Sequence, residues 1–298
     1  MAKDVRVLRY EEAAAVLPVR LRKAALSLSE AEKAAVEEIR LRAGRSMTVL
    51  LPEGERELDV TVEAAELETL CDLATEFSRY AAAETLREGF VSVRGGFRIG
   101  LCGTAVMKDG INTNLKNLSS ASIRVARACT GIADALLPQL LREGQFQSTL
   151  ILSPPGGGKT TLLRDLVRGL SDSGQRIALI DERGEVAVMY QGEPQMDVGA
   201  HTDVLDACPK AVGILMVLRG MNPQIIAVDE ITQRQDLQAM TLAAGCGVAL
   251  LATIHAADTE ELLQKPLYRQ LLEERVFRLV VRIERTQKGR TYTVEELL

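Results

Sequence analysis

From Ser148 onward, short apolar segments alternate with amphipathic ones. The apolar segments contain hardly any polar residue, as expected of strands covered on both faces of a sheet. Each is followed by a polar or glycine-rich stretch and then by a helical pattern, which is typical of a parallel α/β sheet. The predicted central strands are residues 148–153, 176–181, 224–229 and 247–253, and a closing hairpin is predicted at 279–283 and 290–294.

Residues 1–145 have a different pattern. Helical periodicity at 10–38 and 63–80 flanks stretches such as FVSVRGGFRIGLCGTAV, in which glycines and alternating apolar positions indicate strands. This predicts an antiparallel or mixed sheet backed by helices, and hence a separate, smaller α+β domain. The segment 140–147 is the expected linker, so the predicted domains are 1–145 and 146–298.

Composition narrows the class of protein. The 298 residues are 47% hydrophobic and 26% charged, as in folded proteins of about two domains. The net charge of −5 shows no basic excess, and only 3% of residues are aromatic, so we expect no stable nucleic-acid binding. The five cysteines are scattered, without a CxxC pair, which argues against a structural zinc site.

The start of the chain does not resemble a signal peptide, and the odd cysteine count fits a reducing cytoplasm. The longest apolar stretch, Leu242 to Ile254, is shorter than the roughly 20 residues that cross a bilayer. We therefore expect a cytoplasmic protein without direct membrane insertion, whose membrane role would depend on a partner.

The strongest chemical signal is the segment SPPGGGKTT, which follows a predicted strand and precedes an amphipathic helix. This is the context of a P-loop, although Ser153 occupies the position of the usual first glycine. Backbone N–H groups of the glycines would surround a phosphate, while Lys159 would reach the terminal phosphates and Thr160 would hold Mg²⁺. The alternative is a glycine-rich turn with a chance lysine. The predicted nucleotide-binding residues are Pro155, Gly156, Gly157, Gly158, Lys159, Thr160 and Thr161.

A second signal is the apolar segment IIAVDE, which ends in two carboxylates. Asp229 suits a contact with Mg²⁺, made through water, and Glu230 suits polarising the attacking water. The alternative is a strand end with solvated acids. Together with the P-loop, this segment predicts MgATP as the ligand, with Lys159 and Glu230 as catalytic residues and with Thr160 and Asp229 as metal ligands.

Two further strand ends carry polar residues. Asp181 or Glu182 could face the nucleotide, because ligands collect at the carboxyl ends of parallel strands; the alternative is an ordinary polar loop. Thr253 could sense the γ-phosphate, and His255 could hydrogen-bond the substrate or a neighbouring carboxylate, unless it only caps its strand. We count Glu182 and His255 among the candidate catalytic residues.

In their order along the chain, the P-loop, IDERGE, the run from Leu218 to Glu230 and AGCGVALLATIHA resemble the Walker A, acidic, Walker B and histidine boxes of the type II/type IV secretion ATPases. Within that group, EIRLRAGR, SIRVAR and TTLLRDL are similar to the stage III sporulation protein AA family. The resemblance implies a RecA-like P-loop ATPase core, a homohexameric ring and work on membrane-anchored channel proteins during endospore formation. The larger secretion members have Gly-Glu where this chain has Asp229-Glu230, and a four-cysteine zinc module that it lacks.

Arginines are frequent in the predicted N-terminal strands, where Arg40 and Arg42 share a face. Arg124 or Arg127 of a neighbouring subunit could act in trans on the γ-phosphate, as arginine fingers do; salt-bridged surface arginines are the alternative. The candidates are Arg40, Arg42, Arg94, Arg98, Arg124 and Arg127. The leading hypothesis is a motor ATPase in a ring, peripherally associated with a membrane complex. The alternatives are a nucleic-acid translocase and a nucleotide-gated assembly factor.

Overall fold

The computed structural model describes residues 4–79, 83–125, 129–286 and 289–297. The chain forms two compact units, Met1–Arg127 (unit 1) and Ala128–Leu298 (unit 2). Within the described residues, no helix is both long and apolar enough to cross a membrane.

Unit 1 is built on a six-stranded sheet in the order β3-β2-β1-β6-β5-β4, and the neighbouring strands are antiparallel. This agrees with the antiparallel or mixed sheet that the alternating pattern predicts. Gly95 and Gly96 of this pattern form the β4–β5 turn, whereas Gly100 and Gly103 lie within β5. The strands are β1 (Glu38–Arg42), β2 (Ser46–Leu51), β3 (Gly54–Thr61), β4 (Phe90–Val93), β5 (Phe97–Lys108) and β6 (Ile111–Arg124).

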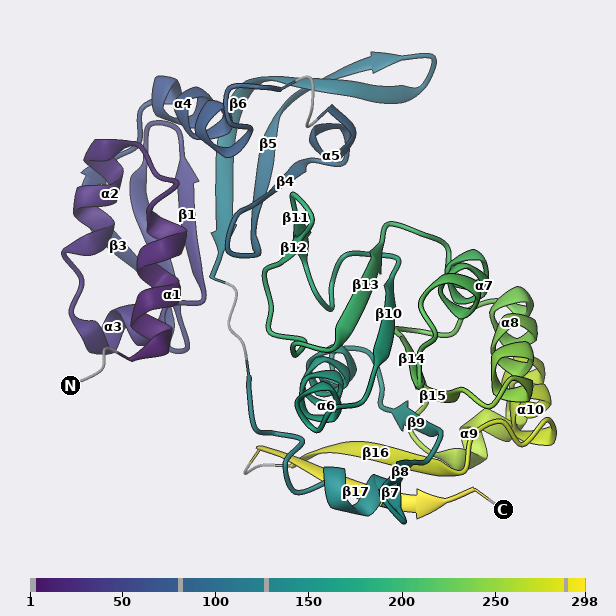
Figure 1. Cartoon of the computed structure of the whole chain (residues 1–298). Helices are drawn as coiled ribbons and strands as arrows, with labels where there is room; N and C mark the ends of the chain where they lie inside the picture. Colours follow the sequence, from purple (N-terminus) through teal and green to yellow (C-terminus); the bar gives the residue numbers. More distant parts are fainter. Residues whose placement is uncertain (1–3, 80–82, 126–128, 287–288, 298) are drawn as a thin grey trace. The chain divides into compact units, whose positions relative to one another are not determined.

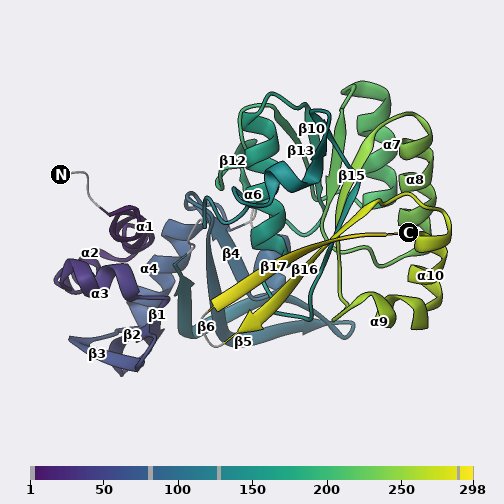
Figure 2. The same ribbon diagram turned by 90° about the horizontal axis from the view of Figure 1, so that it is seen from below.

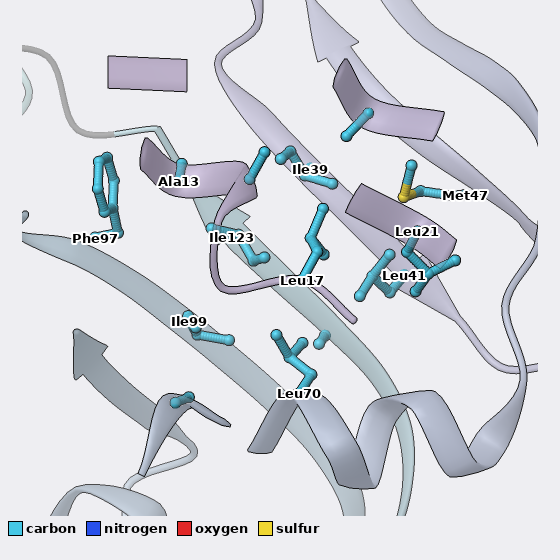
Figure 3. Close-up of a cluster of buried hydrophobic side chains, with 14 of the residues drawn as sticks. Ala13, Leu17, Leu21, Ile39, Leu41, Met47, Leu70, Phe97, Ile99 and Ile123 are labelled. Carbon is cyan, nitrogen blue, oxygen red and sulfur yellow. The ribbon is translucent and has the colours of Figure 1, made fainter. Parts of the chain in front are cut away.

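Helices cover one face of this sheet. They are α1 (Val5–Ala14), α2 (Val19–Leu26), α3 (Glu30–Ala35), α4 (Ala64–Ala74) and α5 (Ala83–Arg87). Figure 3 shows Leu17 close to Ile39 and Ile123 of the sheet, and Leu21 close to Leu41. Leu70 of α4 belongs to the same cluster. Successive residues of a strand point to opposite faces of the sheet. The polar residues that alternate with these apolar positions along the strands therefore line the other face.

Unit 2 contains a seven-stranded sheet in the order β13-β10-β14-β15-β9-β16-β17. Its neighbouring strands are parallel except for the antiparallel pair β16 and β17. The four predicted central strands and the closing hairpin are all present. The strands are β9 (Thr149–Leu152), β10 (Ile177–Asp181), β13 (Thr202–Asp206), β14 (Ile225–Val228), β15 (Ala249–Ile254), β16 (Leu279–Thr286) and β17 (Gly289–Glu296).

Helices lie on both faces of this sheet (Figures 1 and 2). Ile151, Leu179 and Leu251 pack with the apolar side of α6 (Lys159–Asp172), whereas Leu150 and Ile226 point to the opposite face and its helices. The central strands are therefore buried on both sides, which explains their unbroken apolar sequence. The helices of the opposite face are α7 (Lys210–Gly220), α8 (Arg234–Gly245), α9 (Thr259–Gln264) and α10 (Pro266–Glu273).

The division between the units falls after Arg127, earlier than the predicted boundary after residue 145. The segment predicted as a linker contains a 3₁₀ turn (Leu137–Leu140) and the small hairpin β7 (Leu141–Arg142) and β8 (Gln145–Phe146). Leu136, Leu140 and Phe146 are buried in the same cluster as the apolar side of α6. This packing assigns the segment to unit 2. A second small hairpin consists of β11 (Met189–Tyr190) and β12 (Glu193–Pro194).

Candidate nucleotide-binding site

The loop between β9 and α6 has the backbone that its glycines predict. Gly156 and Gly158 have φ values of +73° and +103°, a backbone region that residues other than glycine rarely adopt. A Cβ at Gly157 would lie 1.6 Å from the Oγ of Ser153, so this position also requires glycine. Ser153, which occupies the position of the usual first glycine, is buried, and its hydroxyl donates to the Pro154 carbonyl oxygen at 3.2 Å.

Helix α6 starts directly after this loop, with Gly158 as its N-cap and no side-chain cap. The N–H groups of its first turn have no acceptor within the helix, and they carry the positive end of the helix dipole. Acidic side chains are absent from this first turn, where they would compete with a bound anion. The loop and the start of the helix therefore have the geometry of a phosphate cradle.

Lys159 is only 6% exposed, and its ammonium makes three hydrogen bonds. Its Nζ lies 2.9 Å from the carbonyl oxygen of Ser153, 3.2 Å from that of Pro154 and 2.7 Å from Nδ1 of His255. Burial lowers the pKa of Lys159 below its ordinary value, although the charges of Asp229 and Glu230 act in the opposite direction. A buried cation of this kind favours a ligand with negative charge.

One strand, β15, separates the P-loop strand β9 from β14, which leads to Asp229. The Asp229 carboxylate accepts hydrogen bonds from the hydroxyls of Thr160, at 2.7 Å, and Thr253, at 2.5 Å. The Thr253 hydroxyl also accepts the Glu230 backbone N–H at 2.8 Å. Thr253, fully buried at the end of β15, therefore joins the P-loop side of the site to the acidic strand end.

The Glu230 carboxylate contacts two polar side chains. Its Oε1 is 2.9 Å from Nε2 of His255, and its Oε2 is 2.5 Å from Nη1 of Arg183. Because Nδ1 of His255 accepts from the Lys159 ammonium, the hydrogen-bond pattern assigns the ring proton to Nε2, which donates to Glu230. Glu230 itself has φ +55°, a conformation that costs about 1–3 kcal/mol in a residue other than glycine and is typical of functional sites.

The third acidic strand end has a different arrangement. The Asp181 carboxylate is buried and accepts the backbone N–H groups of Glu185, Val186 and Ala187. It therefore holds the following loop in place at this edge of the sheet. Glu182 is ion-paired with the ammonium of Lys210 at the first turn of α7. Sequence reasoning missed Lys210, which no motif marks, and it did not foresee the contact of Arg183 with Glu230.

The described candidate arginines of unit 1 lie in its strands β1, β5 and β6 or at the β4–β5 turn. Arg40 pairs with Glu38, and Arg42 pairs with Glu55. They share a face, as predicted, and they fit the alternative of salt-bridged surface arginines. Arg98 stacks on the Phe90 ring at 3.6 Å, and Arg124 is exposed at the end of β6. Arg94 is exposed in the β4–β5 turn, and Arg127 lies outside the described residues.

These residues suit a magnesium nucleotide. Thr160 and Asp229 present hydroxyl and carboxylate oxygens at one place, which are the ligands that Mg²⁺ prefers. The glycine-lined cradle and Lys159 lie beside them and suit the charged phosphates. His255 lies beside the Lys159 ammonium and links it to Glu230.

The fold is that of the RecA-like P-loop ATPases. Structures with this fold include the ATPase DotB of Legionella pneumophila, with a TM-score of 0.60 and 17% identity over 95% of this chain and 81% of that chain. The pilus retraction motor PilT with bound ADP has a TM-score of 0.57 and 18% identity over 88% of this chain and 79% of that chain. The predicted fold class is confirmed.

The chain belongs to the family described as sporulation stage III, protein AA, whose sequence pattern matches residues 8–295. The stage III sporulation protein AA of Bacillus subtilis (strain 168) is 36% identical over 282 residues, which cover 93% of this chain and 91% of that protein. The family resemblance of the N-terminal and C-terminal motifs is therefore confirmed.

Proposed function

We propose that the chain binds and hydrolyses MgATP at the carboxyl edge of the sheet in unit 2. The observation that carries this proposal is the hydrogen bond of 2.7 Å between Thr160 of the P-loop helix and Asp229 of the acidic strand end. It brings together the two motifs that share one Mg²⁺ in P-loop enzymes, although they lie far apart in the sequence.

Each residue then has a defined task. The loop N–H groups and Lys159 bind the phosphates, and Thr160 and Asp229 hold the metal, directly or through water. Mg²⁺ would bridge phosphate oxygens and neutralise the charge that develops on them. Glu230 orients and polarises the attacking water. His255 holds the Glu230 carboxylate through Nε2 and is itself held by the Lys159 ammonium through Nδ1. Glu182, held by Lys210, would position the loop that carries Arg183.

The active form in this proposal is a ring, with six copies as the family resemblance suggests. Arg124 or Arg127 of a neighbouring copy completes the γ-phosphate site. Arg124 suits this role because its side chain is exposed at the end of β6, where it stands opposite Glu38 of β1. The ring would drive or assemble a membrane-anchored channel complex during endospore formation, from the cytoplasm of the mother cell.

The experiment that tests this role replaces the chromosomal gene of a spore-forming host by Glu230→Gln and by Lys159→Ala. Because a motor needs ATP turnover, we expect both variants to block sporulation at the same stage. We also expect the wild-type protein to co-purify with membrane proteins only in the presence of ATP. Normal sporulation with Glu230→Gln would favour a nucleotide-gated assembly factor. Salt-dependent binding of DNA or RNA at micromolar protein would favour a translocase.

A further inference from the structure

Arg290 lies next to the phosphate loop of its own chain. Its guanidinium atoms Cζ and Nε are 3.0 Å from the place that a Cβ at Gly158 would occupy. Arg290 is the second residue of β17, far from the P-loop in sequence and part of no motif. The hairpin geometry explains the proximity. Arg282 of β16 pairs with Leu152, the last residue of β9, so the hairpin continues past β9 on the side of the P-loop.

Arg290 and Arg285 stand directly opposite each other in the β16–β17 pair. They share a face with Tyr292 and Ile283, which pack with the cluster that contains α6. Among the described residues, no carboxylate lies within ion-pair distance of either arginine, whereas Arg282 pairs with Glu284 and Glu295. Like charges placed directly across a strand pair are unfavourable. The Arg290 guanidinium beside the phosphate cradle, with the like charge of Arg285 across the strand pair, therefore points to an anionic ligand.

The sheet order indicates which part of a nucleotide Arg290 would meet. Glu230 and His255 follow β14 and β15, on one side of β9, and Lys159 extends towards them. The hairpin β16–β17 lies on the other side of β9. A phosphate chain bound along the P-loop with its terminal phosphate near Glu230 has its nucleoside-proximal phosphates near the hairpin.

We propose that Arg290 is a nucleotide-binding residue that acts in cis on the nucleoside-proximal phosphates. Its bonds are made to phosphates that ATP and ADP have in common. Arg290 therefore contributes to affinity for both nucleotides and little to the chemical step. This inference rests on the proposed function of the P-loop.

The test is the affinity of the full chain for ATP and ADP, each measured by competition with a fluorescent ATP analogue in the presence of Mg²⁺. We expect Arg290→Ala to weaken both nucleotides by the same factor, about tenfold for a charge-assisted bond at a partly exposed site. Arg290→Lys keeps the charge and should retain part of the affinity. Arg142→Ala is the matched control, because Arg142 pairs with Glu296 at the other end of β17 and should leave both affinities unchanged.

Three results would overturn the inference. The first is unchanged affinity of Arg290→Ala for both nucleotides. The second is a loss confined to ATP or to the turnover number, which would move Arg290 to the terminal phosphate. The third is an unfolding temperature of nucleotide-free Arg290→Ala well below that of the nucleotide-free wild-type protein, which would indicate a structural role for Arg290. If wild type itself binds neither nucleotide, the proposed function fails, and this inference fails with it.

Discussion

Replacement of Thr253 by valine tests the link between the two halves of the site. The side chain is fully buried, and its hydroxyl donates to Asp229 and accepts from the Glu230 N–H. Valine has nearly the same shape but makes neither bond. A buried N–H without an acceptor costs about 1–3 kcal/mol, and the lost bond to a carboxylate costs a similar amount. We therefore expect Thr253→Val to lower the free energy of unfolding by about 2–4 kcal/mol.

The effect on turnover should be larger than the effect on nucleotide affinity. Asp229 retains its bond to Thr160, but the backbone that carries Glu230 loses the hydroxyl that holds its left-handed conformation. Misplacement of a catalytic group by about 1 Å costs on the order of 10² in rate. We expect ATP turnover to fall by about that factor, with MgATP affinity changed by only a few-fold.

Thr253→Ser is the control, because serine keeps the hydroxyl and loses only a buried methyl group, at about 1 kcal/mol. Urea denaturation measures stability, and phosphate release at saturating MgATP measures turnover. The reasoning is refuted if Thr253→Val turns over as fast as Thr253→Ser, whatever their stabilities. Equal stability of Thr253→Val and wild type would also refute it.

Three further variants test other parts of the account. His255→Ala should reduce ATP turnover about tenfold or more while nucleotide affinity stays within a few-fold. Unchanged turnover in a phosphate-release assay would show that His255 only caps the end of its strand. Asp165→Asn should lower stability in urea by about 2–4 kcal/mol, because the buried carboxylate accepts two backbone N–H groups and pairs with Arg168. A loss below about 0.5 kcal/mol, which is the usual scatter of surface substitutions, would contradict this. Burial raises the pKa of Glu38, but bonds from Ser122 and a neighbouring arginine outweigh it and lower the pKa overall. The stabilisation is therefore present above the unfolded pKa and lost as pH falls, so Glu38→Gln should be less stable than wild type at neutral pH, with the gap closing in acid melts.

The central strands of unit 2 could be predicted because burial on both faces leaves a continuous apolar run, as in β10 and β14. The edge strand β13 was missed. Its sequence TDVLD has exposed and half-buried residues, so no apolar run marks it. The segment around Leu140 and Phe146 was assigned to a linker, because its few apolar residues show no period and only tertiary packing reveals that they are buried.

The P-loop and the acidic strand end could be predicted because their chemistry depends on residues that are contiguous in sequence. Thr253 and His255 could be placed at the correct edge, since the carboxyl ends of parallel strands share it. The contacts of Lys210 and Arg290 depend on where distant elements meet in space. A single sequence carries no periodic signal for such a contact.

The central claim is that Lys159 serves nucleotide binding and that Glu230 serves the attack of water. The most direct measurement is the rate at which Glu230→Gln hydrolyses labelled ATP in a single turnover, with the protein in excess over ATP. The MgATP affinities of Glu230→Gln and Lys159→Ala are measured by titration in parallel. The account predicts that Glu230→Gln binds MgATP like wild type and hydrolyses it about 10² to 10⁴ times more slowly, whereas Lys159→Ala does not bind. Hydrolysis by Glu230→Gln at the wild-type rate, or an equal loss of binding in both variants, would contradict it.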